Sequence, residues 1–128
     1  MLLPTTLSLA AAGAIINLWL SIRCGMVRAK EHILYGDGGN ELLMRRMRAH
    51  ANFVENTPIM LILAGGIELA GHGGQWLPIV GGIYMLGRVS HGIGMDGKVP
   101  ARSIGATITM LTLLGLAIVA VLIVLGKF

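Results

Sequence analysis

Residues 45–56 read RRMRAHANFVEN and lead directly into TPIMLIL at residues 57–63, so a basic segment passes without a break into an apolar one. Four polar side chains of this segment follow one another at intervals of three or four residues, and these are Arg45, Arg48, Asn52 and Glu55. This spacing places them along one side of a helix. Guanidinium, amide and carboxylate groups are costly inside a bilayer, so their presence on a membrane helix indicates a functional site.

The composition of the whole chain indicates an integral membrane protein. Of its 128 residues, 55% are hydrophobic and 12% are charged, whereas a soluble domain carries about 25% charged residues. The mean hydropathy is +0.77, and a chain of this length cannot enclose so much apolar surface in a soluble core. One domain, residues 1–128, is expected. Because the chain has one cysteine, Cys24, an internal disulfide is excluded.

Four apolar segments predict an all-α bundle of four transmembrane helices. The predicted helices cover roughly residues 2–22, 48–70, 77–94 and 102–125. The first is uncharged over a length that crosses the hydrocarbon layer, and it is expected to be a retained helix and not a signal peptide. After a polar, glycine-rich connection, Glu41 restarts a helix with Asn40 as its N-cap. Asn17 is expected to form a hydrogen bond to another helix.

Basic residues are concentrated at one end of this arrangement. Nine of the ten Lys and Arg residues border the first or the third connection, and these are Arg23, Arg28, Lys30, Arg45, Arg46, Arg48, Arg88, Lys98 and Arg102. The positive-inside rule makes that side cytoplasmic and places both termini on the opposite side. Membrane orientation explains the net charge of +4, so no nucleic-acid partner is expected.

Most of these nine residues are arginines, and several lie about one turn inside an apolar boundary. Arg binds a carboxylate through a planar, two-pronged set of donors that Lys lacks, so a ligand with carboxylate groups is one interpretation. The alternative is that the side chains reach out to lipid phosphates. Arg46 and Lys98 are expected to lie in solvent or against lipid and to contribute little.

The segment RMRAHANFVE at residues 46–55 resembles the signature of the membrane-associated proteins in eicosanoid and glutathione metabolism, the MAPEG family, which includes the microsomal glutathione transferases. With Arg45 the pattern R-x-x-R-A-H-x-N-x-x-E is complete, and GRVSH at residues 87–91 and ARS at residues 101–103 add to the likeness. The resemblance covers essentially the whole chain, and the GDGG turn at residues 36–39 is most similar to the bacterial branch. It implies a homotrimer in a bacterial inner membrane, with glutathione bound between neighbouring subunits near the cytoplasmic face.

The resemblance also implies which residues bind glutathione, and by their positions these are Arg48, Asn52, Glu55 and Arg88, with His50 where relatives carry His or Gln. The family has a further arginine near the cytoplasmic end of the first helix, for which Arg23 and Arg28 both qualify. Arg102 matches the arginine that is proposed to act near the thiol, and it is the expected catalytic residue. His91 and Met95 stand where relatives often carry tyrosines, and His91 is expected to replace one of them. No metal ligand is implied.

These assignments agree with the chemistry of glutathione, which has two carboxylates, an ammonium and a thiol. Arginines would bind the carboxylates, Glu55 would pair with the ammonium, and Arg102 would stabilise the thiolate. The implied activity is a glutathione transferase that conjugates glutathione to hydrophobic electrophiles arriving from the membrane lipid, with reduction of peroxides as a further activity. Two alternatives stay open. One is a non-catalytic lipid- or ligand-binding membrane protein on the same scaffold, and the other is a small four-helix transporter that uses Glu55.

Overall fold

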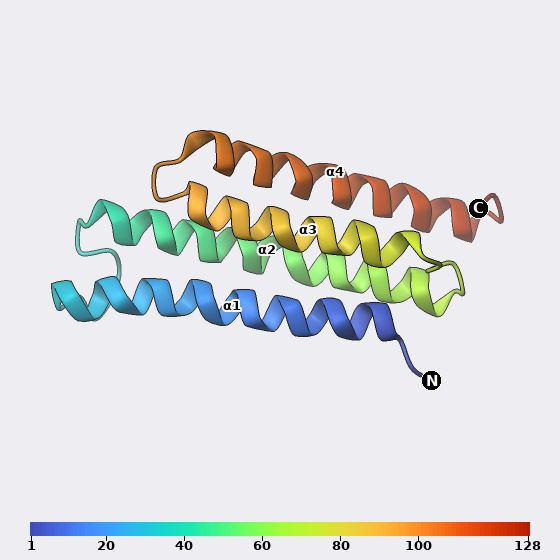
Figure 1. The fold of residues 1–128 in the computed structure, drawn as a ribbon, viewed down its shortest axis with the longest axis horizontal. Coiled ribbons are helices and arrows are strands. Elements are labelled where there is room, and N and C mark those ends of the chain that lie inside the picture. The colour runs from blue at the N-terminus through green and yellow to red at the C-terminus, as the bar shows by residue number, and fades with distance from the viewer.

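The computed structural model describes residues 1–128 and contains four helices joined by short connections. They are α1 (Pro4–Glu31), α2 (Glu41–Leu69), α3 (Trp76–Gly94) and α4 (Val99–Val124). The helices run up and down beside one another, and both termini lie at one end of the bundle (Figure 1). The opposite end holds the connections 32–40 and 95–98, and it is called the basic end below. The predicted all-α, four-helix architecture is confirmed.

α1 is longer than the sequence pattern predicts. The predicted helix ends near residue 22, where charged residues begin, but α1 continues to Glu31. Most residues between these points are good helix formers, and Arg28 and Lys30 in the last turn interact favourably with the helix dipole. The helix stops at His32, which has a left-handed φ of 55°. The onset of charge therefore does not end the helix.

α2 begins at Glu41, where the sequence predicts that a helix restarts, and it continues without a break into the apolar segment predicted to span the membrane from about residue 48. The side-chain oxygen of Asn40 accepts a hydrogen bond from the Leu43 N–H at 2.9 Å, which confirms the predicted N-cap. As a consequence α1 and α2 extend beyond α3 and α4 at the basic end (Figure 1). Asn17 of α1 and His50 of α2 lie 2.8 Å apart, from Oδ1 to Nε2, and this contact confirms the interhelical hydrogen bond expected for Asn17.

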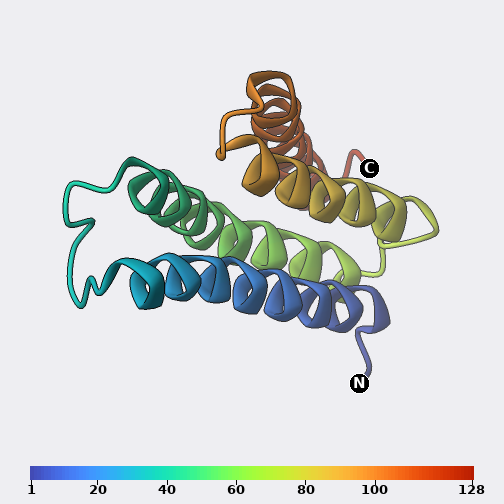
Figure 2. The same ribbon diagram turned by 60° about the vertical axis from the view of Figure 1, so that its left-hand side comes forward.

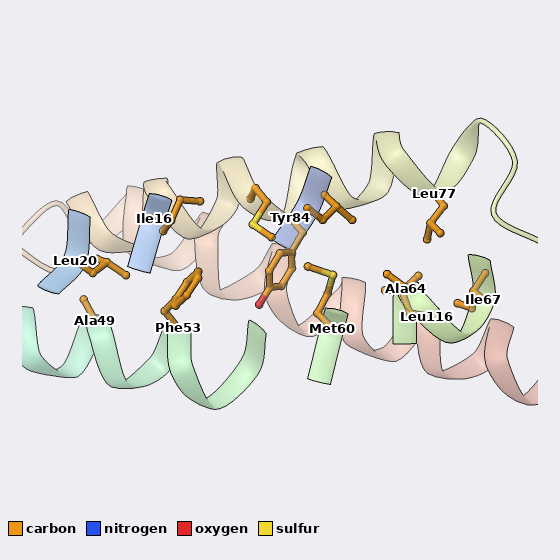
Figure 3. Packing of buried hydrophobic residues seen from close by; sticks show 12 residues of the cluster. Ile16, Leu20, Ala49, Phe53, Met60, Ala64, Ile67, Leu77, Tyr84 and Leu116 are labelled. Carbon is orange, nitrogen blue, oxygen red and sulfur yellow. The ribbon is translucent and has the colours of Figure 1, made fainter. Parts of the chain in front are cut away.

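The core runs along the bundle and is built from all four helices, with α2 contributing the largest share of its buried apolar residues. Figure 3 shows the Tyr84 ring at the middle of the buried cluster, between Phe53 and Met60. The Tyr84 hydroxyl lies 2.9 Å from Thr57 Oγ1 of α2. α4 is inclined to the other helices (Figure 2). It approaches α3 so closely that a Cβ at Gly105 would overlap the carbonyl oxygen of Gly87, and the absence of a side chain at Gly105 permits this approach.

At the end opposite the basic one, Glu68 of α2 caps the first turn of α1. Its carboxylate accepts hydrogen bonds from the backbone N–H groups of Thr5 and Thr6, each at 2.8 Å, and from the Thr6 hydroxyl at 2.7 Å. The first N–H groups of a helix have no partner within the helix, so an acidic side chain from a neighbour satisfies them. The contact joins the beginning of α1 to the end of α2.

The outer surface of the bundle is strongly apolar. α1 and α4 are long and apolar enough, by length and composition, to cross a membrane. α4 exposes a series of large apolar side chains, which include Ile104, Met110, Leu111, Leu114 and Ile118. A contiguous apolar surface of this kind suits lipid or another protein chain better than water.

Candidate functional site

The most deeply buried charged side chain belongs to Arg88 of α3, a residue that is 1% exposed. Its Nη1 donates a hydrogen bond to Thr109 Oγ1 of α4 at 2.8 Å, and its Nη2 donates to Asn52 Oδ1 of α2 at 2.6 Å. Its Nε has no partner, and no carboxylate of the chain forms an ion pair with it. These hydrogen bonds join three helices. They also occupy the amide oxygen of Asn52 and leave its NH2 group to donate elsewhere.

His91 lies one turn after Arg88 and is also buried. It packs tightly on α4, where a Cβ at Gly105 would come within 2.6 Å of the His91 Cβ. Its Nδ1 has no hydrogen-bond partner. The sequence assigns Arg88 and His91 to ligand contact, and the structure places both inside the single chain and not on its surface.

Three of the expected site residues lie on the surface: Arg48 and Glu55 of α2 and Arg102 of α4. None of the three forms an ion pair within the chain. Arg48 and Glu55 precede and follow Asn52 by about one helical turn. Arg45, the fourth member of the predicted row, pairs with Glu41 at 2.5 Å. The row on α2 therefore presents a free cation, an amide donor and a free carboxylate.

The backbone around Arg102 is held against the end of α3. Ser90 Oγ donates a hydrogen bond to the Ala101 carbonyl oxygen at 2.8 Å. A Cβ at Gly94 would overlap the backbone nitrogen of Arg102, so this approach of α3 to α4 requires glycine. The first turns of α4 are thereby fixed while the Arg102 side chain stays exposed.

A groove of about 510 Å³ runs between α1 and α2 near the basic end, and Cys24, Arg28, Met47 and His50 are among the residues that line it. Arg28 Nη1 donates a hydrogen bond to the Gly36 carbonyl oxygen at 2.7 Å, and Arg28 has no carboxylate partner. The sequence does not decide between Arg23 and Arg28 as the ligand-binding arginine of the first helix. In the structure Arg28 is the one that lines a groove and has no acidic partner.

Arg23, the other candidate, is engaged within the bundle. It forms an ion pair with Asp96, and its Nη1 donates to the Gly92 carbonyl oxygen at 2.8 Å. Arg46 binds the same carboxylate, with Nη2 at 3.2 Å. The expectation that Arg46 lies in solvent or against lipid is wrong, because its side chain is 18% exposed and pairs with an acid fifty positions away.

Sequence reasoning missed two residues that organise this region, Thr109 and Asp96. Nothing in an apolar helix distinguishes Thr109 as the partner of a buried arginine. Asp96 did carry a signal, because it is the only acidic residue after Glu68 and it lies in a connection bordered by basic residues. An isolated acid in such a position favours a structural ion pair.

Comparison with known proteins extends these findings. The model of the MAPEG family matches residues 6–122. The inner membrane protein YecN of Escherichia coli is 29% identical over 89 residues, which cover 70% of this chain and 68% of YecN, and it matches equally in two strains. The four-helix bundle and the matched segment agree in extent, since the match spans all four helices. This chain therefore belongs to the MAPEG family, the membrane-associated proteins in eicosanoid and glutathione metabolism.

Proposed function

We propose that the protein is a membrane-bound glutathione transferase. It binds glutathione, stabilises it as a thiolate and conjugates it to hydrophobic electrophiles. The observation that carries the proposal is the row on α2, in which Arg48 and Glu55 are exposed and unpaired on either side of Asn52, whose amide is oriented by Arg88. These groups follow one another at intervals of about one helical turn. The unpaired cation and the amide donor suit a carboxylate, and the unpaired anion suits the ammonium of the same small peptide.

A second copy of the chain completes this site in our proposal. Unpaired charges on a helix within a bilayer are costly, so they are expected to face another protein surface or a ligand. The α2 residues that line the groove, among them His50 and Val54, occupy a different side of the helix from Arg48, Asn52 and Glu55. The groove also holds Arg28, which supplies a further unpaired cation. In a ring of three subunits, one subunit contributes Arg28 and His50, and its neighbour contributes Arg48, Asn52 and Glu55.

Each charged residue considered for the site then has a defined chemical role. Arg48 and Arg28 bind the two carboxylates of glutathione through paired N–H donors, and Glu55 binds the ammonium. Arg88 acts through Asn52, and Arg23 takes no part in binding because it is occupied by Asp96. Arg102 lies beside the thiol and lowers its pKa, since a nearby cation favours the charged form.

The reaction requires little chemistry from the protein once the thiolate is formed. The thiolate sulfur attacks the electrophilic carbon, an S–C bond forms, and the leaving group departs with its electron pair. The protein contributes positioning and stabilisation of charge. The same thiolate can attack the outer oxygen of a hydroperoxide, which breaks the O–O bond and releases an alkoxide that takes up a proton to become the alcohol. The glutathione sulfenic acid that forms condenses with a second glutathione to give the disulfide and water, so peroxide reduction is a second reaction to assay.

For location we propose a bacterial inner membrane, with four spanning helices and the basic end in the cytoplasm. The relative named above is an inner membrane protein of Escherichia coli. The basic end carries Arg and Lys residues around both of its connections, as cytoplasmic loops do. Glutathione is then available on the side where Arg102 lies, and hydrophobic electrophiles reach the site from the lipid.

The decisive experiment is addition of glutathione to the purified protein in detergent, followed by ultraviolet absorbance of the thiolate and by conjugation of chlorodinitrobenzene. The expected result is a thiolate signal that saturates with glutathione and is absent with S-methylglutathione, which has no thiol proton to lose. Binding of both compounds without thiolate or product would overturn the transferase and favour a non-catalytic binding protein. Proton-coupled uptake into vesicles, lost in Glu55→Gln, would favour the transporter.

A further inference from the structure

Asp96, in the connection between α3 and α4, binds two arginines from two other helices. Arg23 of α1 forms one ion pair with its carboxylate. Arg46 of α2 forms the other, with Nε at 3.3 Å from Oδ1 and Nη2 at 3.2 Å from Oδ2, which is a two-pronged contact. The α3–α4 connection is in this way attached to both long helices at the basic end.

The same two arginines also bind backbone carbonyl groups. Arg23 Nη1 donates to the carbonyl oxygen of Gly92 in the last turn of α3, at 2.8 Å, and Arg46 Nη1 donates to the carbonyl oxygen of Arg23 at 3.0 Å. The Arg23 guanidinium lies 4.8 Å from the centre of the Trp19 ring. Gly92 packs on this ring, since a Cβ there would lie 2.9 Å from it. The contacts therefore form a single network and not an isolated ion pair.

The network is partly withdrawn from solvent. The side chains of Arg23, Arg46 and Asp96 are 12%, 18% and 27% exposed. Removing the one carboxylate would leave two partly buried guanidinium groups close together without an anion, and such a loss costs more than the loss of a surface pair. The pair between Arg45 and Glu41, at the same end of the bundle, is far more exposed and serves as the natural comparison.

The position of Asp96 in the chain connects this network to Arg102. Only Gly97 and Lys98 separate Asp96 from the beginning of α4 at Val99. The first turns of α4 rest on Gly94, whose backbone leaves no room for a Cβ beside the Arg102 nitrogen. A shift of the connection therefore moves the backbone that carries Arg102.

We propose that Arg23, Asp96 and Arg46 form a latch that positions Arg102. The three are positioning residues, because they act through the α3–α4 connection and do not contact the reacting thiol. This inference rests on the proposed function for its catalytic part. Its structural part, that the latch holds the first turns of α4 in place, stands apart from any activity.

The test uses Asp96→Asn in the full-length protein, with Glu41→Gln as the matched control that removes a carboxylate from the exposed pair. Hydrogen exchange of the backbone amides of residues 102–105 is followed without glutathione. The Arg102 N–H bonds to the Lys98 carbonyl oxygen at 3.1 Å in the intact helix, so its exchange reports whether this turn is formed. Exchange should quicken in Asp96→Asn and stay unchanged in Glu41→Gln, while amides in the middle of α2 keep wild-type rates.

The catalytic arm combines Asp96→Asn with Arg102→Ala. Displacement of a catalytic group by about 1 Å costs up to about 100-fold in rate, so Asp96→Asn should lower kcat and the thiolate yield by about 10- to 100-fold with a smaller change in KM. The double variant should be no slower than Arg102→Ala alone, because both changes remove the same contribution. Asp96→Glu, which keeps the charge, should recover part of the loss.

The outcomes separate the two proposals. A wild-type protein that forms no thiolate overturns the proposed function, and the exchange experiment still decides whether the latch holds α4. If the wild type is active and Asp96→Asn has normal turnover and normal exchange, the latch is wrong and the transferase stands. A double variant that is much slower than Arg102→Ala also overturns the latch, because Asp96 would then act independently of Arg102. Should Asp96→Asn fail to fold, the same comparisons are made with Arg46→Lys, which loses the two-pronged contact but keeps the charge.

Discussion

At the scale of single residues, the informative feature is which charged side chains form ion pairs within the chain and which have no partner there. Arg45 has Glu41 as its partner, whereas Arg48 and Glu55 on the same helix have none. We expect Arg48→Ala and Glu55→Gln each to weaken glutathione binding by about 10- to 100-fold, since a hydrogen bond to a charged group contributes about 1.5–3 kcal/mol. Titration calorimetry on the purified protein measures this. Arg45→Gln is the control on the same helix, and an equal loss there would mean that general positive charge, and not a site, attracts the ligand.

The second prediction at this scale separates chemistry from binding. Arg102 is exposed and unpaired, and it belongs to α4, whereas the Arg48–Glu55 row belongs to α2. Arg102→Ala should lower kcat and the thiolate yield while glutathione binding, measured by calorimetry, changes by less than about tenfold, because the carboxylate and ammonium contacts remain. Full turnover in Arg102→Ala would show that another group stabilises the thiolate.

At the scale of helices, close packing of α3 on α4 fixes the geometry of the site. A Cβ at Gly105 would overlap the Gly87 carbonyl oxygen, whereas a Cβ at Gly115 on the same helix meets nothing within 4 Å. Gly105→Ala should therefore destabilise the protein by about 1–3 kcal/mol through overpacking. Gly115→Ala should be neutral or stabilising by up to about 1 kcal/mol, since Ala is the better helix former. Thermal unfolding in detergent compares the two, and equal effects would argue against the tight α3–α4 contact.

The helices also show what a sequence can predict and what it cannot. The sequence predicts the features that depend on residues close together in the chain. These are the four apolar segments, the Asn40 cap and the basic residues beside the first and third connections. The onset of charge predicts an end of the first helix near residue 22, but the residues after Arg23 favour a helix and α1 continues to Glu31. The isolated position of Asp96 indicates an ion pair, but the sequence does not show which arginine it binds, and it gives no sign of Thr109 as the partner of Arg88. Both partners lie far away in sequence and meet their arginines only after the helices pack.

At the scale of the whole molecule, the distribution of charge predicts how the bundle sits in the membrane. Both termini lie at the end opposite the basic one (Figure 1). If the basic end is cytoplasmic, the C-terminus faces the periplasm. Alkaline phosphatase fused after Phe128 should then be active, because it folds only outside the cytoplasm, and green fluorescent protein at the same position should be dark. The reverse pattern would place the proposed site on the side that lacks cytoplasmic glutathione.

Assembly is the last property that the exposed charges on α1 and α2 predict. If Arg28 comes from one subunit and Arg48 from its neighbour, then subunits with Arg28→Ala and subunits with Arg48→Ala can restore each other. In a randomly mixed trimeric ring made from equal amounts, about one quarter of the interfaces join the two intact halves, so co-expressed and differently tagged subunits should regain about a quarter of the wild-type sites. The control mixes subunits that carry Arg48→Ala with subunits that carry Glu55→Gln. Both changes lie in the same half of the site, so this mixture should regain no wild-type sites. No recovery in the first mixture would mean that each chain holds its whole site alone, and the groove beside His50 would then need another explanation.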